Sequence, residues 1–386
     1  MRVMRLAFTL PGDRGFEAMQ VLFGLAVVLT TSAMAQQVPR VQSPEVRPDR
    51  RVTFRFLAPN GKDVSLVLEG ADKAPMKQDD NGIWTITTDP LEPDLYGYSF
   101  LVDGVDLVDP NNTRIKPNLL SLSNVVHVPG RATLLWEVQD VPHGEVHHHF
   151  YKSSIVGEQR DFYVYTPPGY DPKSKTVYPV LYLLHGFSDD ASAWTAVGQA
   201  NIILDNLIAQ GKARPMIVVM PLGYGAPEML SYGFQAFQHE ELRQRNFNRF
   251  RETLLKEVMP QVEAMYPILR DGKNRAIAGL SMGGAESLLN GLNNIDTFAW
   301  IGAFSSGGLG GKFASDFPSL NAAGSGRLRL LWIACGEQDH LIDDNRRLKA
   351  WLKSQNVSFT DIETPGAHTW MVWRRNLIAF STLLFR

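Results

Sequence analysis

The sequence predicts an α/β fold, a mostly parallel, doubly wound sheet with helices on both faces, preceded by a small all-β sandwich. Three observations support this. In the C-terminal part of the chain, wholly apolar segments alternate with helical segments, which is typical of parallel strands buried on both faces. A Gly-x-Ser-x-Gly pattern, Gly279 to Gly283, lies between one such strand and a helix. Residues 51–130 instead show a period of two, with turn signals and no helical stretch.

Composition sets further bounds. The chain has 386 residues, of which 44% are hydrophobic and 20% charged, as in a soluble globular protein large enough for two domains. Its formal net charge of −2 and the lack of a basic run give no reason to expect a nucleic-acid partner. The one cysteine, Cys335, excludes an internal disulfide and a cysteine-based metal site, and it lies in an apolar run that predicts a buried strand thiol.

The first 35 residues are typical of a signal peptide. A basic start precedes an apolar core at 21–29, and Ala33-Met34-Ala35 forms a cleavage pattern. The apolar core is too short for a comfortable membrane span. If translation began at Met19, the arginines would be lost and the signal would weaken. We therefore expect export, with cleavage after Ala35 and a secreted or periplasmic mature protein.

Residues 36–50 are polar and rich in proline, which predicts a flexible lead-in. From 51 to 130, hydrophobic residues alternate with polar ones, and turns at Pro59-Asn60-Gly61 and Asp80-Asn81-Gly82 separate the runs. Short strands at this spacing predict an immunoglobulin-like β-sandwich. The strands are expected around 52–56, 64–68, 83–86 and 96–100.

The same residues resemble a known group of modules. The segments 81–84, 93–100, 102–104 and 109–111 are similar to the early-set immunoglobulin-like modules that precede glycogen-branching enzymes and some carbohydrate esterases. Some members of that group bind glucans and others only pack against the catalytic domain. Trp84, Tyr96 and Tyr98 could stack on sugar faces, although alternating strand positions favour the core.

After a linker at 131–142, a larger domain covers 143–386. Residues 161–166 alternate like an edge strand, whereas 179–184 is a continuous apolar strand and 215–221 another buried strand. Three further runs are also predicted strands, and apolar strands alternating with helices indicate a parallel sheet covered on both faces. His147, His148 and His149 point to opposite faces in turn on an extended chain, so they do not form one tight metal site by themselves. The strands after 161–166 are expected around 179–184, 215–221, 298–304, 328–335 and 357–362, and helices over 200–210, 249–266 and 345–355.

The segment 275–289 combines a strand end, the Gly-x-Ser-x-Gly turn and a helix start, which together predict a nucleophile elbow. Small neighbours are needed because so sharp a turn strains the backbone, and Gly279, Gly283 and Gly284 supply them. The turn lifts the Ser281 hydroxyl clear of the sheet. With this elbow the predicted architecture is the α/β-hydrolase fold.

A serine needs a base, and the base needs an orienting acid. In this fold the chain order is serine, acid, histidine. His368 follows the strand 357–362 in a glycine-containing loop and is the expected base, whereas His340 is expected to be a loop residue. Asp339 is the favoured acid and Asp343 the second choice. Glu337 and Asp344 are nearby alternatives.

An oxyanion hole needs two backbone donors. The N–H of Met282, at the start of the helix, is one candidate. The N–H of Phe187, in the loop after the strand that ends at Leu184, is the other. His185 is expected to brace that loop. Trp194, Tyr224, Trp370 and Trp373 could line an aromatic acyl pocket, with core packing as the alternative for each.

Residues 143–386 resemble the esterase D-type family, which includes feruloyl and acetylxylan esterases of carbohydrate esterase family 1, enterochelin esterases and S-formylglutathione hydrolases. The similarity lies in several separate motifs. They are the segments 179–186, 204–208, 215–221, 279–284 and 366–373, and Trp194. The resemblance implies Ser281 as nucleophile, Asp339 as acid and His368 as base, as the chain order does. Ala367 stands where glycine is common.

We therefore expect a serine carboxylesterase that needs no metal or organic cofactor. A signal peptide and a module of sugar-enzyme type favour feruloyl or acetyl esters of xylan as substrates. Siderophore ester hydrolysis is the rival within the class. Outside it, the chain could be a glycan-binding protein with an idle hydrolase domain, or an acyltransferase. The sequence does not define the acyl group, the leaving group or the oligomeric state.

Overall fold

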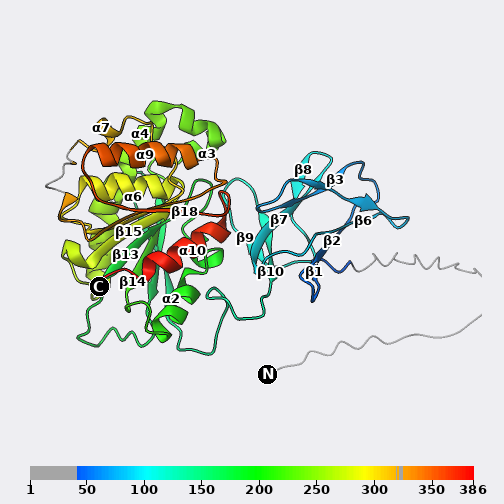
Figure 1. Cartoon of the computed structure of the whole chain (residues 1–386), viewed down its shortest axis with the longest axis horizontal. Coiled ribbons are helices and arrows are strands. Elements are labelled where there is room, and N and C mark those ends of the chain that lie inside the picture. Colours follow the sequence, from blue (N-terminus) through cyan, green and yellow to red (C-terminus); the bar gives the residue numbers. More distant parts are fainter. Residues whose placement is uncertain (1–40, 319, 321–324) are drawn as a thin grey trace, which may run out of the picture. The chain divides into compact units, whose positions relative to one another are not determined.

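The computed structural model describes residues 41–318, 320 and 325–386, so the predicted signal peptide lies outside the described residues. Val41 to Arg386 form one compact unit. It contains a two-sheet module followed by a domain built on one large sheet (Figure 1). Within the described residues, none of the helices has the length and apolarity needed to cross a membrane.

The N-terminal module, residues 41–130, is a sandwich of two antiparallel sheets, as the alternating pattern predicts. One sheet has the order β1-β2-β6-β5, and the other has the path β4-β3-β7-β10-β9, with β8 paired to β7. The strands are β1 (Glu45–Val46), β2 (Val52–Leu57), β3 (Val64–Leu68), β4 (Ala74–Pro75), β5 (Lys77–Gln78), β6 (Ile83–Thr87), β7 (Asp94–Val102), β8 (Val105–Leu107), β9 (Ile115–Lys116) and β10 (Ser123–Val128).

The module begins before residue 51. The prediction of a flexible lead-in over 36–50 is wrong for 41–50, because Glu45–Val46 pairs with β2 and the Val41 and Ser43 side chains are buried. Trp84, Tyr96 and Tyr98 are buried between the sheets, in a core that also contains Phe54 and Phe100. Their burial favours the core role that their alternating positions suggested over stacking on sugars.

The segment predicted as a linker, 131–142, is packed against the larger domain. Trp136 is buried, and the guanidinium of Arg374 lies 5.6 Å from the centre of its ring. The Leu135 and Glu137 carbonyl groups accept hydrogen bonds from the Asn206 side chain. These contacts fix the connection between the module and the larger domain.

The large sheet has eight strands in the order β11-β12-β14-β13-β15-β16-β17-β18. Strands β13 to β18 pair in parallel, and β11 and β12 are antiparallel. The segment predicted as an edge strand is β12, and it is not at the edge, because β11 pairs along its outer side. The strands are β11 (Glu145–Lys152), β12 (Gln159–Thr166), β13 (Val180–Leu184), β14 (Ile217–Pro221), β15 (Arg275–Leu280), β16 (Trp300–Phe304), β17 (Leu330–Gly336) and β18 (Thr360–Thr364).

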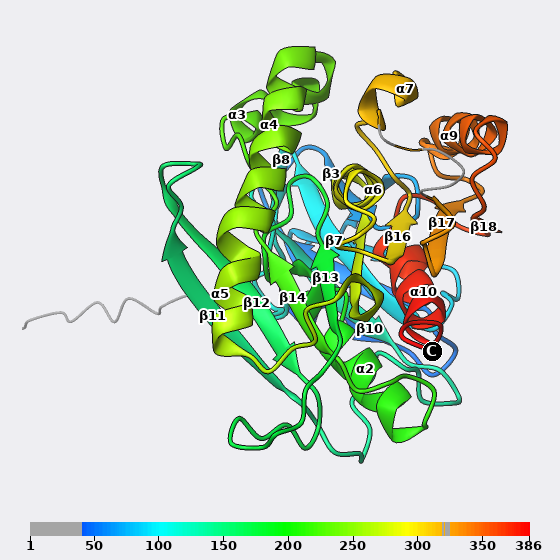
Figure 2. The same cartoon turned by 90° about the vertical axis from the view of Figure 1, so that its left-hand side faces the viewer.

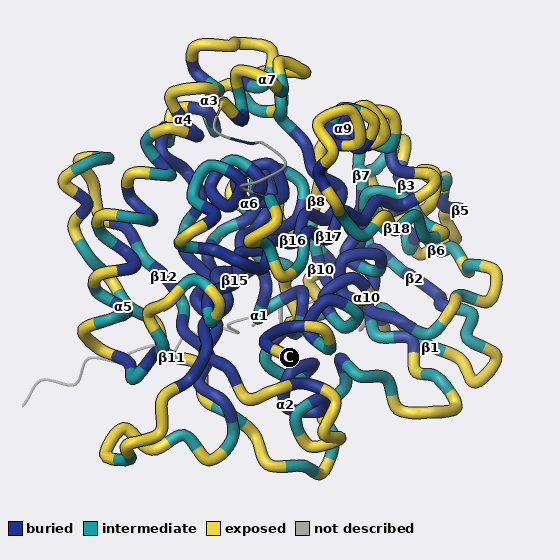
Figure 3. The backbone as a smooth tube through the Cα atoms, turned by 60° about the vertical axis from the view of Figure 1, so that its left-hand side comes forward, coloured by how far each residue is buried: buried dark blue, intermediate teal, exposed yellow. Residues whose placement is uncertain are grey.

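Helices cover both faces of this sheet, which is why its central strands are apolar throughout (Figures 2 and 3). One face packs on α2 (Ala200–Ala209) and α10 (Trp370–Ser381). The other packs on α5 (Met259–Met265), α6 (Met282–Asn293) and α9 (Ile342–Ser354). The helix predicted over 249–266 starts earlier. Its segments are α4 (Glu240–Thr253), the π-turn η2 (Leu254–Val258) and α5.

The three adjacent histidines lie on β11 and behave as an extended chain requires. His147 and His149 stack on one face, 6.4 Å apart, and His149 is hydrogen-bonded to the Tyr266 hydroxyl. His148 instead contacts Asp161. The three rings do not converge on one point.

Candidate active site

The Ser281 backbone has the strained geometry of a nucleophile elbow. Ser281 joins β15 to α6 with φ 51° and ψ −115°, a conformation that a residue with a side chain rarely adopts. Two hydrogen bonds hold it there: its N–H donates to the Phe304 carbonyl at 2.9 Å, and its carbonyl accepts from the Gly307 N–H at 2.9 Å. A side chain at Gly283 would place its Cβ 2.5 Å from the His185 carbonyl oxygen, so only glycine is compatible with this packing.

Asp339 and His368 form the charged part of the site. Asp339, in the turn after β17, is 2% exposed, and its Oδ2 lies 2.8 Å from Nδ1 of His368. Its Oδ1 accepts the Leu341 N–H at 2.9 Å. Burial alone would raise the pKa of the Asp339 carboxyl, but the hydrogen bond and charge of His368 outweigh it and hold the pKa below its usual value.

The other carboxylates considered from the sequence point elsewhere. Asp343 has an 80% exposed side chain, 3.7 Å from Arg346, and Asp344 is paired with Arg347. Glu337 is exposed. Among these four acids, Asp339 is the one hydrogen-bonded to His368.

The strand register brings the three loops to one edge of the sheet. Leu280 pairs with Phe304, Phe304 with Ala334, and Gly336 with Thr364, so the segments with Ser281, Asp339 and His368 leave neighbouring strands at their carboxyl ends. Gly307 lies between the segment with Ser281 and the segment with Asp339. A Cβ built there would be 2.7 Å from the Leu341 side chain and 3.6 Å from Ser281 Oγ. The loop that contains Asp339 and Leu341 and the Ser281 hydroxyl therefore flank the same glycine.

The loop after β13 packs against the elbow. A Cβ on Gly186 would lie 2.6 Å from Leu280 Cδ1 and 3.4 Å from Ser281 Cβ, so the backbone that leads to Phe187 passes directly over the serine. His185 braces this loop: its Nδ1 contacts the Gly186 carbonyl at 2.8 Å, and its Nε2 accepts the Gly223 N–H at 2.8 Å. Burial lowers the pKa of His185 to about 4, so its ring stays neutral near pH 7.

Four aromatic residues proposed to contact substrate are buried. Trp194 and Trp370 are each 1% exposed and stack edge-to-face, with Trp194 Nε1 donating to the Leu184 carbonyl. Trp373 packs its ring edge-to-face against His368 and donates to Ser305. The hydroxyl of buried Tyr224 donates to the Asp189 carbonyl. Their burial favours the core-packing alternative: these rings support the loops, and Trp194 and Trp370 have no free face for a substrate.

A different aromatic group lies at the loop after β13, and it was not predicted from the sequence. Phe234 and Phe237, from the short helix η1 (Gly233–Gln238), contact the Phe187 ring at centroid distances of 5.2 and 5.0 Å. Phe234 is 71% exposed. Phe237 also faces Gly308, next to the glycine that lies against Ser281 Oγ. The signal available in the sequence was two phenylalanines three residues apart, directly after Gly233. We call Phe187, Phe234 and Phe237 the aromatic wall.

One group of side chains at the site is compact enough for a metal ion. Ligand atoms of Asp339, His340 and His368 lie within 4.8 Å of one another. The His340 and His368 rings meet edge-on at 4.7 Å. Because the Asp339–His368 hydrogen bond uses an atom of each, a metal bound there would have to compete with it.

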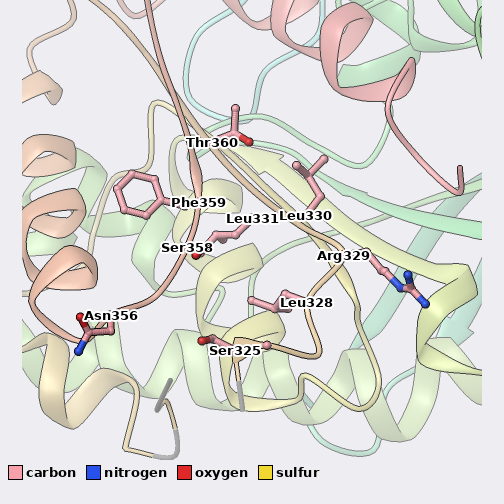
Figure 4. A pocket seen from close by; sticks show the side chains of 10 residues that line it. Ser325, Leu328, Arg329, Leu330, Leu331, Asn356, Ser358, Phe359 and Thr360 are labelled. Carbon is pink, nitrogen blue, oxygen red and sulfur yellow. The ribbon is translucent and has the colours of Figure 1, made fainter. Parts of the chain in front are cut away.

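A surface hollow lies away from these loops. It is lined by residues at the amino ends of β17 and β18, including Leu330 and Thr360, and in the segments that precede them (Figure 4). Ser281, Asp339 and His368 follow the carboxyl ends of their strands. In open parallel sheets ligands bind at the carboxyl ends, so this hollow is not part of the candidate site.

A hydrolase sheet with a serine elbow and an Asp–His pair defines the class of α/β-hydrolases. Residues 153–384 match the model of the family described as putative esterases, and the chain belongs to this family. Residues 42–118 match carbohydrate-binding module 48, the isoamylase N-terminal domain. The predicted fold class, the family resemblance and the sugar-enzyme type of the module are thereby confirmed.

Two curated relatives are esterases. An endo-1,4-β-xylanase/feruloyl esterase of Xylanibacter ruminicola is 30% identical over 357 residues, which cover 90% of this chain and 46% of that protein. The chain thus spans about half the length of that relative. An acetyl esterase of Caldicellulosiruptor saccharolyticus is 24% identical over 229 residues, covering 50% of this chain and 79% of the relative.

Solved structures share the fold. The ferulic acid esterase of the fungus Anaeromyces mucronatus is 23% identical, with a TM-score of 0.56, over 71% of this chain and 97% of that one. The enterobactin esterase of Shigella flexneri is 18% identical, with a TM-score of 0.66, over 86% of this chain and 92% of that one.

Proposed function

We propose that the protein is a serine carboxylesterase whose triad is Ser281, His368 and Asp339. The observation that carries this proposal is the 2.8 Å contact between His368 Nδ1 and buried Asp339, at the same sheet edge as a serine with positive φ. An imidazole whose Nδ1–H is held by a carboxylate keeps Nε2 free as an acceptor, which is the tautomer a general base needs.

The reaction follows from these positions. Ser281 Oγ attacks the ester carbonyl, and its proton passes to His368 Nε2. The tetrahedral oxyanion is bound by the Met282 and Phe187 N–H groups, with the positive end of α6 behind it. Collapse expels the alcohol, which takes the proton from His368. The acyl group is now bound to Ser281 Oγ. Water, deprotonated by His368, attacks its carbonyl; the bond from the acyl carbon to Oγ breaks, Oγ takes the proton back from His368, and the acid leaves. Asp339 stabilises the imidazolium in both steps.

The aromatic wall favours a substrate with an aromatic acyl group. Phe234 is exposed beside Phe187, whose N–H is the proposed oxyanion donor, so a planar acyl group bound at Ser281 could stack there. Relatives named as feruloyl and acetyl esterases agree with esters of plant polysaccharide as substrates. A feruloyl ester on xylan is the preferred substrate, and acetyl xylan is the smaller alternative.

A siderophore esterase is the second candidate. The similarity to the enterobactin esterase of Shigella flexneri covers 86% of this chain, and so includes part of the module as well as the hydrolase domain. At 18% identity it supports the shared fold alone. The aromatic wall is also compatible with a dihydroxybenzoyl group, so substrate tests must decide.

Two further proposals concern where the enzyme acts and what its module contacts. Export, from the signal-peptide pattern at 1–35, would place the enzyme where polysaccharide esters occur. The module, which matches a carbohydrate-binding family, could contact glycan as well as the catalytic domain. A glycan-binding protein with an idle hydrolase domain, and an acyltransferase, are the alternatives from other classes.

The test compares methyl ferulate, p-nitrophenyl acetate and enterobactin as substrates of the wild type and of Ser281→Ala. The proposal predicts that ferulate is hydrolysed best and that the variant loses activity on all three. Preference for enterobactin would move the protein to iron acquisition. Transfer of the acyl group to an added sugar would indicate an acyltransferase. Equal inactivity of wild type and variant would overturn the esterase proposal.

A further inference from the structure

The N-terminal module contacts two segments next to proposed catalytic groups: the turn after Phe187 and the start of α10 after His368. On the oxyanion-loop side, the Asn118 side chain donates from Nδ2 to Ser188 Oγ at 2.9 Å and to Asp189 Oδ1 at 3.2 Å. The neighbouring Leu119 N–H donates to the Ser188 carbonyl at 2.7 Å. The acceptors of all three hydrogen bonds belong to Ser188 and Asp189, the two residues that follow Phe187.

Ser188, which accepts two of these hydrogen bonds, has a strained backbone conformation. Ser188 has φ 71°, so the turn 186–189 includes a non-glycine residue in the left-handed region. Such a conformation is unfavourable and persists only where the surroundings hold it. Asn118 is itself fixed, because its Oδ1 accepts the N–H groups of Leu120 and Ser121 in a local turn. A rigid donor therefore holds the strained residue next to the proposed oxyanion donor.

On the side of His368, the Glu69 side chain of the module makes the corresponding contacts. Its Oε1 accepts the Trp370 N–H at 2.8 Å, at the first residue of α10 and two residues after His368. Its Oε2 accepts the Gly97 N–H of β7 at 2.9 Å. The carboxylate thus ties the start of α10 to the module sheet, where the positive end of the helix favours negative charge.

The contacts of Asn118 and of Glu69 lie close together in the module. Lys116, two residues before Asn118, lies beside Gly97, on which Glu69 is anchored. Burial alone would raise the pKa of Glu69, but the charges of Lys116 and Arg374 and the two N–H donors outweigh it and hold the pKa below its usual value. Glu69 is therefore an anion near pH 7. Asp94 of β7 adds a buried ion pair with Arg374 of α10, at 2.6 Å.

We propose that the N-terminal module is part of the catalytic apparatus, and that Asn118 and Glu69 are positioning residues for the Phe187 N–H and for His368. This inference rests on the proposed esterase function. It goes beyond it in assigning a role in the hydrolysis to a module whose family is named for carbohydrate binding. The catalytic domain alone would then carry the triad without its working geometry.

The test uses the whole chain and five variants: Asn118→Ala, Asn118→Ala combined with Ser188→Ala, Glu69→Gln, the control Asn81→Ala and Ser281→Ala. Asn81 is exposed in a turn of the same module. We measure kcat and KM for methyl ferulate, the melting temperature, and the inhibition constants of a phenylboronic acid and of ferulic acid. The boronic acid forms a tetrahedral adduct on serine and so uses the oxyanion hole, whereas ferulic acid binds as a ground-state product.

A small displacement of an oxyanion donor costs about 10- to 100-fold in rate. Asn118→Ala should therefore lower kcat by about 10- to 100-fold, with KM changed less than about 3-fold. The boronic acid should lose affinity in parallel with kcat, while ferulic acid should not. Glu69→Gln keeps one acceptor and should lower kcat by about 3- to 10-fold. A combined Asn118→Ala and Ser188→Ala variant should be no worse than Asn118→Ala alone, because both remove the same contact.

The outcomes separate this inference from the proposed function. If Ser281→Ala is inactive but Asn118→Ala and Glu69→Gln match Asn81→Ala in kcat and boronic acid affinity, the positioning role is wrong and the esterase stands. If Asn118→Ala lowers only the melting temperature, the module is a stabilising partner and the inference also fails. If Ser281→Ala keeps full activity, the esterase proposal fails instead.

Discussion

The carboxylate of Asp339 is hydrogen-bonded to Nδ1 of His368 at 2.8 Å, although the two residues lie 29 positions apart in the chain. Asp339 follows β17 and His368 follows β18, two parallel neighbours that release their loops at the same edge. The carboxylate is fully buried, and it orients the His368 ring, whose side chain is 22% exposed. The account of catalysis depends on this pair, and the first prediction tests it.

Asp339→Asn should lower kcat by about 10³- to 10⁴-fold, because an amide can hold the wrong tautomer of His368 and cannot stabilise the imidazolium. The measurement is kcat for methyl ferulate at pH 7. Asp343→Asn is the matched control, since Asp343 was the second choice for the acid and is exposed. Its kcat should stay within about 2-fold of wild type. A larger loss in Asp343→Asn than in Asp339→Asn would reassign the acid.

Phe234→Ala should weaken the preference for aromatic over small acyl groups. Loss of a stacking ring from the aromatic wall is expected to reduce kcat/KM for methyl ferulate by about 5- to 30-fold and to leave methyl acetate nearly unchanged. The ratio of the two kcat/KM values is the readout. Tyr232→Ala is the control, because Tyr232 is exposed nearby but packs on His239. Equal ratios in the two variants would remove the aromatic wall from the substrate site.

Cys335 should be chemically silent in the folded enzyme. Burial, and to a lesser degree the charge of Asp339, raise the pKa of its thiol to about 12, so almost no thiolate is present near neutral pH. We expect no reaction with a disulfide reagent over an hour under native conditions and no loss of activity. One thiol per chain should react after denaturation. Rapid inactivation of the native enzyme would show that the thiol is accessible.

Acid should weaken the fold partly through Glu363. Hydrogen bonds from Arg346 and Lys349 lower the pKa of its carboxyl to about 2. Because the folded pKa is depressed, the stabilisation is fully present above the unfolded pKa of about 4.3 and is lost as pH falls towards 2. Glu363→Gln should cost about 1 kcal/mol at pH 7, since the group is partly exposed. Urea unfolding gives the free energy of unfolding of the wild type and of Glu363→Gln. The difference between the two proteins should be clearly smaller at pH 2.5 than at pH 7. A constant difference would exclude this linkage.

The sequence was sufficient to predict the α/β sheet, because the apolar runs of β13 to β17 leave little choice but burial on both faces. It also located Ser281, since two glycines around a serine between strand and helix have few other uses. The pairing of β11 outside β12 escaped notice, because edge position depends on the neighbour in space and not on alternation.

Other features depend on contacts between distant segments. Trp194 and Trp370 meet edge-to-face in the core, and a sequence pattern does not tell a core tryptophan from a pocket tryptophan. The contact of Glu69 with the start of α10 joins residues 301 positions apart, so local patterns carry no trace of it. Phe234 was overlooked for the same reason: its contact with Phe187 exists only after folding.

Labelling with a fluorophosphonate tests the central claim most directly. Attack by the Ser281 hydroxyl forms an O–P bond and expels fluoride, and the hydroxyl proton passes to His368. Mass spectrometry of the digested protein should find one phosphonyl group per chain, on the peptide with Ser281, and ester hydrolysis should fall in step with labelling. The variant His368→Ala should label far more slowly. Labelling at another residue, or full inhibition without a label on Ser281, would contradict the proposed nucleophile.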